Sequence, residues 1–259
     1  MKGPTTVLPG LNAAKPQDQA GDTYIAFLKT LNIFADKDKH VIKDCSLIVE
    51  EREKLGIIGK AGSGKTQLVL TLVLMNSADS ESRVYIDGLD IFEMSVKSLR
   101  SRITIIPQHP KIFRDTLRSN IDPCCQFADS DIWLAIEACQ LKDFVNSLPC
   151  GLNQLVSSKS MNDEQQSQVN VCRALLKGGQ IFIIDQSTKL MNEEIRAKVE
   201  EALLLSLKQS TTITVGNDFE DVKHCDRVVV IENGVIVTLD TPHALISKYG
   251  TLQKCLSSC

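Results

Sequence analysis

Residues 55–66 read LGIIGKAGSGKT. The apolar run 55–58 is typical of a short buried strand, and the segment 66–75, TQLVLTLVLM, has the length and apolar content of a buried helix. The loop between them fits the pattern GxxxxGK[ST]. Its glycines let the backbone curl around a phosphate group, and the following helix offers free N–H groups and the positive end of its dipole. The stretch therefore predicts a loop that binds the phosphates of a nucleotide. A chance glycine turn is the alternative, and the flanking strand and helix argue against it.

Each position of this loop has an expected role in nucleotide binding. Lys65 is expected to reach the β- and γ-phosphates, and the hydroxyl of Thr66 is expected to ligate Mg²⁺. The nucleotide-binding set that we assign to the loop comprises Gly59, Lys60, Ala61, Gly62, Ser63, Gly64, Lys65, Thr66 and Gln67.

A second apolar run, IFIIDQST at 181–188, ends in an acid. Asp185 has the position of a second Mg²⁺ partner at the end of a buried strand. An Asp at a strand end can also serve as a helix cap, but the upstream phosphate loop favours the metal role. Gln186 follows, an amide where a carboxylate would help to activate water. The pair raises the question of whether the protein hydrolyses the nucleotide that it binds.

The composition excludes several classes of protein. The chain has 259 residues, enough for one large α/β domain or two small ones, and its formal net charge of -3 argues against a general nucleic-acid-binding surface. No stretch approaches the roughly 20 apolar residues that cross a bilayer, and the N-terminus lacks the apolar core of a secretory signal. None of the nine cysteines forms a CxxC pair, and the four histidines show no metal-ligand spacing. We therefore expect a soluble intracellular protein with reduced thiols.

Strand and helix signals alternate along most of the chain. Residues 1–21, with several Pro and Gly, read as a flexible leader. Asp87-Gly88 and Asn233-Gly234 each separate two β-rich runs and predict tight hairpin turns. Apolar residues at helical spacing dominate about 115–176, which suggests a separate helical lobe. Strands that alternate with helices elsewhere predict a largely parallel sheet with helices on its faces.

Taken together, these motifs resemble the nucleotide-binding domain of ABC transporters, over roughly residues 24–250. The stretch 85–123, YIDGLDIFEMSVKSLRSRITIIPQHPKIFRDTLRSNIDP, carries most of the likeness and is similar to the second such domain of the C subfamily, the multidrug-resistance-protein type. The resemblance implies an α/β P-loop NTPase fold of ABC type, with a mostly parallel core sheet, an antiparallel β subdomain and a helical subdomain. It implies one ATP-binding domain over 22–250 and a C-terminal tail over 251–259.

The resemblance adds two residues to the expected site. Gln108 falls at the position of the family's Q-loop glutamine, which touches Mg²⁺ and the transmembrane partner. Phe34 falls at the position of the aromatic residue that stacks on adenine, although a plain core role stays open for it. The metal set is then Thr66, Gln108 and Asp185, and the implied ligands are ATP and Mg²⁺.

The sequence departs from the family at the signature motif LSGGQ. Counting back from Arg173, the motif's five positions are held by Met161, Asn162, Asp163, Glu164 and Gln165. In the family this helix start presents backbone amides to the γ-phosphate bound by the opposite subunit. Glu164 replaces a glycine there and brings a negative charge toward a polyanion, at a cost of several kcal/mol in a poorly solvated cleft. Asp163 adds to this repulsion, so we expect the signature function to be lost.

Three further departures concern the hydrolytic step. Gln186 stands where the family has its catalytic glutamate, and a neutral amide orients water but cannot take its proton. Asn217 replaces the switch histidine after the strand TTITV, and Asn192 replaces the D-loop aspartate. No catalytic residue is intact, so the resemblance implies a domain that binds ATP and is impaired in hydrolysing it.

The implied partners follow from these losses. The domain would pair, as a heterodimer, with a second ABC nucleotide-binding domain whose signature is intact, and both would couple to transmembrane domains at the cytoplasmic face of a membrane. The alternative is a soluble non-transporting protein that uses ATP as a structural or regulatory ligand, which the polar start at Met1 and the lack of a membrane span favour. A working ATPase of another P-loop family is poorly supported, since no other acid or base stands out after Asp185.

Overall fold

The computed structural model describes residues 24–36, 39–75, 82–251 and 254–255, and these form two compact units. The helical unit comprises 104–179 and 187–209, and the sheet unit comprises the described residues within 18–103, 180–186 and 210–259. The expected leader, 1–21, and most of the expected tail, 251–259, lie outside the described residues.

The larger sheet has the strand order β12-β11-β3-β10-β9-β6. Its strands are β3 (Lys54–Ile58), β6 (Ile103–Ile106), β9 (Ile181–Asp185), β10 (Thr211–Val215), β11 (Arg227–Glu232) and β12 (Val235–Asp240). The pairings of β10 with β3, of β10 with β9 and of β11 with β3 are parallel, whereas β11 and β12 form an antiparallel hairpin. The apolar strands are buried, as expected for a parallel sheet covered on both faces. This confirms the expected α/β P-loop class.

The strand register sets the position of the functional residues. Val215 of β10 pairs with Ile57 of β3 on one side and with Asp185 of β9 on the other. These three residues therefore lie side by side near the carboxyl ends of three parallel strands. The phosphate loop leaves β3 at this edge, where ligands bind in open α/β sheets.

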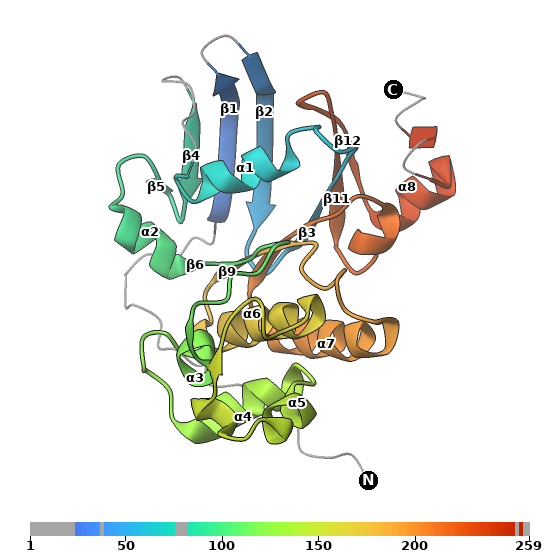
Figure 1. Cartoon of the computed structure of the whole chain (residues 1–259). Helices are drawn as coiled ribbons and strands as arrows, with labels where there is room; N and C mark the ends of the chain where they lie inside the picture. The colour runs from blue at the N-terminus through green and yellow to red at the C-terminus, as the bar shows by residue number, and fades with distance from the viewer. Residues whose placement is uncertain (1–23, 37–38, 76–81, 252–253, 256–259) are drawn as a thin grey trace. The chain divides into compact units, whose positions relative to one another are not determined.

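A second, antiparallel sheet lies in the same unit, with the order β2-β1-β4-β5. Its strands are β1 (Tyr24–Asp36), β2 (Lys39–Glu50), β4 (Arg83–Ile86) and β5 (Leu89–Asp90). The long β1 lies between β2 and β4 (Figure 1). Asp87 and Gly88 join β4 to β5 with φ angles of 51° and 76°, the positive values that a two-residue hairpin turn requires.

The described part of the sheet unit also contains helical segments. They are α1 (Lys65–Leu72), α2 (Val96–Arg102), η3 (Phe219–Val222) and α8 (Pro242–Tyr249). One apolar cluster of this unit consists of Ile58, Phe219, Val222, Val228, Val230, Leu245 and Cys255. Cys225 packs against this cluster, and burial raises the pKa of its thiol to about 12, so the thiol stays neutral.

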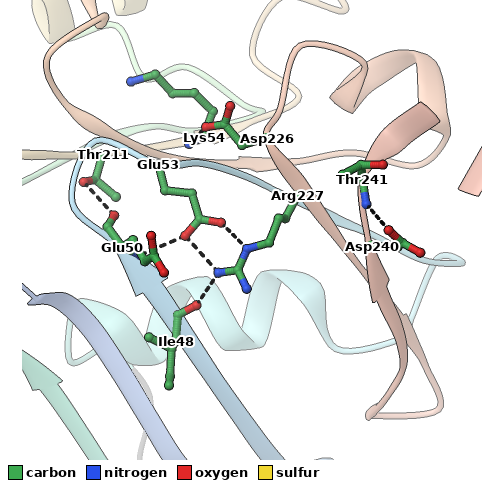
Figure 2. Close-up of polar contacts among 9 residues, drawn as sticks. All are labelled: Ile48, Glu50, Glu53, Lys54, Thr211, Asp226, Arg227, Asp240 and Thr241. Atoms are coloured by element: carbon green, nitrogen blue, oxygen red, sulfur yellow. Dashed lines mark hydrogen bonds and ion pairs between the residues drawn. The ribbon is translucent and has the colours of Figure 1, made fainter. Parts of the chain in front are cut away.

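A polar network joins the amino ends of β3 and β11 to the end of β2 (Figure 2). The guanidinium of Arg227 donates to both carboxylate oxygens of Glu53, at 2.5 and 2.9 Å, and to the carbonyl of Ile48 at 2.8 Å. Glu53 also accepts from the amide of Glu50 at 2.8 Å. Lys54 and Asp226 exchange two hydrogen bonds beside this pair. The network lies at the opposite end of the strands from the phosphate loop.

The helical unit holds five α-helices in its described part, drawn from green to orange in Figure 1. They are α3 (Leu117–Ile121), α4 (Asp129–Ala138), α5 (Lys142–Ser147), α6 (Asp163–Lys177) and α7 (Glu193–Ser206), with the short η2 (Gly151–Asn153), β7 (Asp115–Thr116) and β8 (Leu155–Val156) between some of them. Gln168 on α6 donates to the carbonyls of Cys139 and Gln140 at the end of α4, which ties these two helices together. In the part of the chain that the structure describes, no helix combines the length and apolar character needed to span a membrane.

Candidate nucleotide-binding site

The phosphate loop has the backbone that its glycines allow. Gly62 and Gly64 have φ angles of 82° and 104°, values that L side chains rarely adopt. Gly64 is the N-cap of α1, and no side chain caps the helix at this end. The first turn of α1 therefore points its amides toward the loop, as an anion site at a helix N-terminus requires.

Lys65 lies inside the curl of the loop. Its ammonium group donates to the carbonyl of Gly59 at 2.7 Å and to that of Lys60 at 2.9 Å, and its side chain is buried. A buried ammonium needs partners of this kind, because burial without them is costly. The positive charge of the loop is thus held where a phosphate group would be bound.

Two observations show that the loop fits a phosphate group. A cavity of about 210 Å³ is lined by Gly62, Ser63, Gly64, Lys65, Thr66 and Gln67. The hydroxyl of Ser63 is buried and has no hydrogen-bond partner among the described residues. Buried polar groups normally have a partner, and a ligand oxygen would supply one here. The sequence placed these residues in one loop, and the structure places them around one cavity.

The expected Mg²⁺ partners in the sheet unit are the hydroxyl of Thr66 and the carboxylate of Asp185. Thr66 is exposed beside the cavity, whereas Asp185 is buried at the end of β9. Within the described residues, no three His, Cys, Asp or Glu side chains gather as a metal site. Mg²⁺ commonly takes one or two protein oxygens and completes its shell with phosphate oxygens and water, so the residues present fit such an ion.

Gln186 and Asn217 contact each other at the same sheet edge. The side-chain amide of Asn217 donates to the side-chain oxygen of Gln186 at 3.0 Å. Gln186 has a φ of 45°, an uncommon conformation for a residue with a side chain, and it turns the chain sharply after Asp185. The sequence analysis named the two residues for different reasons, and the structure shows that their side chains are hydrogen-bonded to each other.

Asp221 fixes the backbone that carries Asn217, and sequence reasoning missed this role. Its carboxylate accepts from the amides of Asn217 at 2.7 Å and Asp218 at 3.2 Å. A side chain at Gly216 would place its Cβ 2.5 Å from the Cβ of Asp221, so the approach requires glycine. The available signal was the spacing of Asp218 and Asp221, which form a capping box at the start of η3.

The segment at the signature position begins α6 in the helical unit. Asn162 is the N-cap, and its side chain accepts from the amide of Gln165 at 2.8 Å while the Gln165 side chain accepts from the amide of Asn162 at 3.1 Å. Asp163 and Glu164 occupy the first turn, where carboxylates are favoured by the helix dipole. The helix start is therefore satisfied by its own side chains and carries two negative charges.

Glu164 is also held by Asn192, the residue at the D-loop position. The Asn192 amide donates to the Glu164 carboxylate at 2.8 Å, and its oxygen caps α7 by accepting from the amide of Ile195 at 2.9 Å. One asparagine thus joins the starts of α6 and α7. Sequence reasoning identified both positions but not the contact.

The two remaining expected residues lie elsewhere. Gln108 is half-buried in the bend that follows β6, in the helical unit. Phe34 lies on β1, where it pairs with His40 of β2 in the backbone register. The side chain of Phe34 lies outside the description, so its adenine-binding role stays a prediction.

The phosphate loop on β3, the acid at the end of β9 and the polar loop after β10 define a P-loop nucleotide-binding domain. A family model described as "ABC transporter" matches residues 42–189. The chain belongs to this family, as an ABC-type ATP-binding domain.

Individual relatives point to the C family of these transporters. The chain is 35% identical over 220 residues to ABC transporter C family member 14 of Dictyostelium discoideum. The aligned region covers 82% of this chain and 17% of that protein. The chain is 34% identical over 213 residues to ATP-binding cassette sub-family C member 3 of Homo sapiens, covering 81% of this chain and 14% of that protein. The chain therefore spans less than a fifth of the length of these curated relatives.

A solved structure shares the fold. A bacterial Atm1-family ABC exporter with ATP bound superposes with a TM-score of 0.83 at 21% sequence identity, covering 89% of this chain and 41% of the exporter chain. Because the identity is low, this similarity establishes the architecture alone.

Proposed function

We propose that this domain binds MgATP and hydrolyses it poorly, and that it couples nucleotide binding to a membrane transporter. The observation that carries the hydrolytic part of the proposal is the hydrogen bond between Gln186 and Asn217. Two neutral amides occupy the positions at which the family has a base and a histidine, so neither can accept the proton of an attacking water.

The binding part of the proposal uses the phosphate loop. The ammonium of Lys65 now donates to Gly59 and Lys60, and we propose that β- and γ-phosphate oxygens take over some of these hydrogen bonds. The unpartnered hydroxyl of Ser63 and the uncapped start of α1 supply further donors. Thr66 and Asp185 would hold Mg²⁺, which supplies positive charge against the phosphates. Phe34 and Gln108 are proposed to contact adenine and Mg²⁺, respectively.

The start of α6 at Asn162 supports the proposal that this domain contributes poorly to the nucleotide site of an opposite ABC domain. In the family this element offers backbone amides to a nucleotide held by the opposite domain. Here the Gln165 amide already donates to the Asn162 side chain, and Asp163 and Glu164 place negative charge beside it. A phosphate group would lose both the donor and the favourable field at this position.

The partners of the domain follow from this asymmetry. Two identical copies would place two such helix starts over two phosphate loops, so we propose a heterodimer with an ABC domain whose signature is intact. We further propose that transmembrane domains complete the assembly at the cytoplasmic face of a membrane, because the Dictyostelium relative is named an ABC transporter and this chain covers only 17% of its length.

Thermal unfolding with and without MgATP tests the binding proposal. A ligand that binds only the folded state stabilises it by about 2.7 kcal/mol at a hundredfold excess over Kd. MgATP should raise the unfolding temperature of the wild type and leave Lys65→Ala unchanged, with Lys54→Ala as a lysine control at the far end of β3. An equal shift in Lys65→Ala would rule out the phosphate loop as the binding site.

Affinity capture of the full chain tests the proposed partners. Recovery of a polytopic membrane protein together with a second ABC domain is the expected result. Recovery of soluble proteins alone would contradict the transporter role and favour ATP as a regulatory ligand of a soluble complex.

A further inference from the structure

The tip of the β11–β12 hairpin contacts the phosphate loop from outside. β11 ends at Glu232 and β12 begins at Val235, with Asn233 and Gly234 between them. Their φ angles are 50° and 81°, the conformation of a tight two-residue turn that strongly favours glycine at the second position. The hairpin was expected from the Asn-Gly pair, but its contact with the loop was not.

Three contacts join this tip to the amino-terminal half of the phosphate loop. The amide of Gly234 donates to the carbonyl of Ser63 at 3.1 Å. The ammonium of Lys60 lies 3.1 Å from the carboxylate of Glu232. The carbonyl of Ile231 approaches Gly59 so closely that a Cβ there would lie 2.2 Å from the oxygen. The tip therefore contacts the loop at Gly59, Lys60 and Ser63.

The same turn also contacts the antiparallel sheet. The carbonyl of Gly234 accepts from the amide of Lys43 on β2 at 2.8 Å. Gly234 thus donates to the phosphate loop with one backbone group and accepts from β2 with the other. The tip is therefore anchored to β2, independently of the phosphate loop. Because it is anchored there, the tip can resist displacement of the loop.

The two faces of the loop are consequently held in different ways. The inner face is held by Lys65, whose hydrogen bonds can pass to phosphate oxygens. The other face is held by tip residues, none of which is among the residues that line the cavity, Gly62 to Gln67. We propose that the β11–β12 tip braces the phosphate loop in its binding shape, with Glu232 and Gly234 as positioning residues. This inference rests on the proposed nucleotide binding.

A simple charge effect makes the opposite prediction for Glu232. If Glu232 acted only through its negative charge near the phosphates, replacing it with lysine would tighten nucleotide binding. If Glu232 braces the loop, Glu232→Lys instead replaces the 3.1 Å ion pair with Lys60 by two ammonium groups that repel each other. This repulsion would displace the loop from the tip and weaken nucleotide binding. The sign of the change in affinity therefore separates the two accounts.

The first experiment measures the Kd for MgATP of the whole chain by isothermal titration calorimetry, with Glu232→Lys and, as a matched charge reversal, Glu137→Lys at the exposed ion pair with Lys142. Exposed ion pairs are worth roughly 0.2–1 kcal/mol, so we expect Glu232→Lys to raise Kd about 2- to 5-fold and Glu137→Lys to leave it unchanged. An unchanged or lower Kd in Glu232→Lys overturns the ion-pair brace.

The second experiment tests the glycine with a matched hairpin. Gly234→Ala and Gly88→Ala each put a side chain at the second position of a two-residue turn, with φ angles of 81° and 76°. Both should lower the unfolding temperature, but only Gly234→Ala should raise the Kd for MgATP. Equal Kd values for the two variants contradict the brace. A wild type that does not bind MgATP contradicts the proposed function instead.

Discussion

Gln186 and Asn217 are joined by a hydrogen bond between their side-chain amides. A carboxylate or an imidazole at these positions would titrate, whereas two amides keep their hydrogen bond at any pH at which the protein is folded. The pair therefore positions the chain after β9 against the chain after β10 without offering a proton acceptor.

Restoring the family residues should restore hydrolysis only in a complete site. We expect Gln186→Glu/Asn217→His to raise ATP turnover by at least about 10²-fold, the lower bound for general-base help, when an ABC domain with an intact LSGGQ signature is present. Phosphate release is the measurement, and the same double substitution on Lys65→Ala is the control. No gain in the restored chain, with binding intact, would place the defect elsewhere.

The contact between Glu164 and Asn192 makes a second residue-scale prediction. Asn192→Asp would replace a hydrogen-bond donor with a second carboxylate at a 2.8 Å contact. We expect a lower unfolding temperature that recovers partly in high salt, since salt screens exposed charges. Glu164→Gly should remove this salt dependence from the Asn192→Asp chain. A salt-independent loss would mean that the missing hydrogen bond from Asn192 to Glu164, not charge repulsion, dominates.

At the scale of elements, α6 is defined by its capping box. Asn162→Ala removes the side chain that accepts from Gln165, and N-cap substitutions of this kind cost about 1 kcal/mol. In Asn162→Ala, urea unfolding should show a lower free energy of unfolding, and hydrogen exchange should show less protection of the α6 amides. Asn162→Asp, which preserves the acceptor, is the matched control. Equal protection in Asn162→Ala would show that packing alone fixes the helix start.

Local patterns predicted the elements better than the contacts between them. Four elements could be recognised because the chemistry that defines each of them is local in the sequence. They are the turns at Asp87-Gly88 and Asn233-Gly234, the buried strand before the phosphate loop, and the strand β9 with the sequence IFIID. The contacts of Asn217 with Gln186 and of Glu232 with Lys60 join residues whose proximity depends on strand order and register. The sequence therefore identifies these residues but does not show that they are in contact. The roles of Phe34 and Gln108 stay predictions.

At the scale of the whole molecule, the sheet unit has a binding edge and a structural edge. The phosphate loop lies at the carboxyl ends of the strands, and the Glu53–Arg227 network of Figure 2 lies at the amino ends. Arg227 reaches from β11 to the carbonyl of Ile48 on β2, so it ties the parallel sheet to the antiparallel one.

Breaking this network should weaken the fold without affecting nucleotide affinity. Arg227→Met leaves the buried carboxylate of Glu53 without its guanidinium partner, and an unsatisfied buried group costs about 1–3 kcal/mol. Lys198→Met, which removes the exposed pair with Glu194, should change the unfolding free energy little. Urea unfolding checks the stability, and the Kd for MgATP should stay unchanged in both variants. Equal stability losses would contradict a structural role specific to Glu53.

The proposed function requires that this ABC-type domain bind MgATP and hydrolyse it poorly. The most direct measurement incubates the pure chain with γ-labelled MgATP and determines bound nucleotide and released phosphate in the same sample, beside Lys65→Ala. The account predicts stoichiometric bound ATP that is lost in Lys65→Ala, and phosphate release far below about 1 s⁻¹, the low end of typical enzyme turnover. Sustained release at or above that rate, dependent on Lys65, would contradict it.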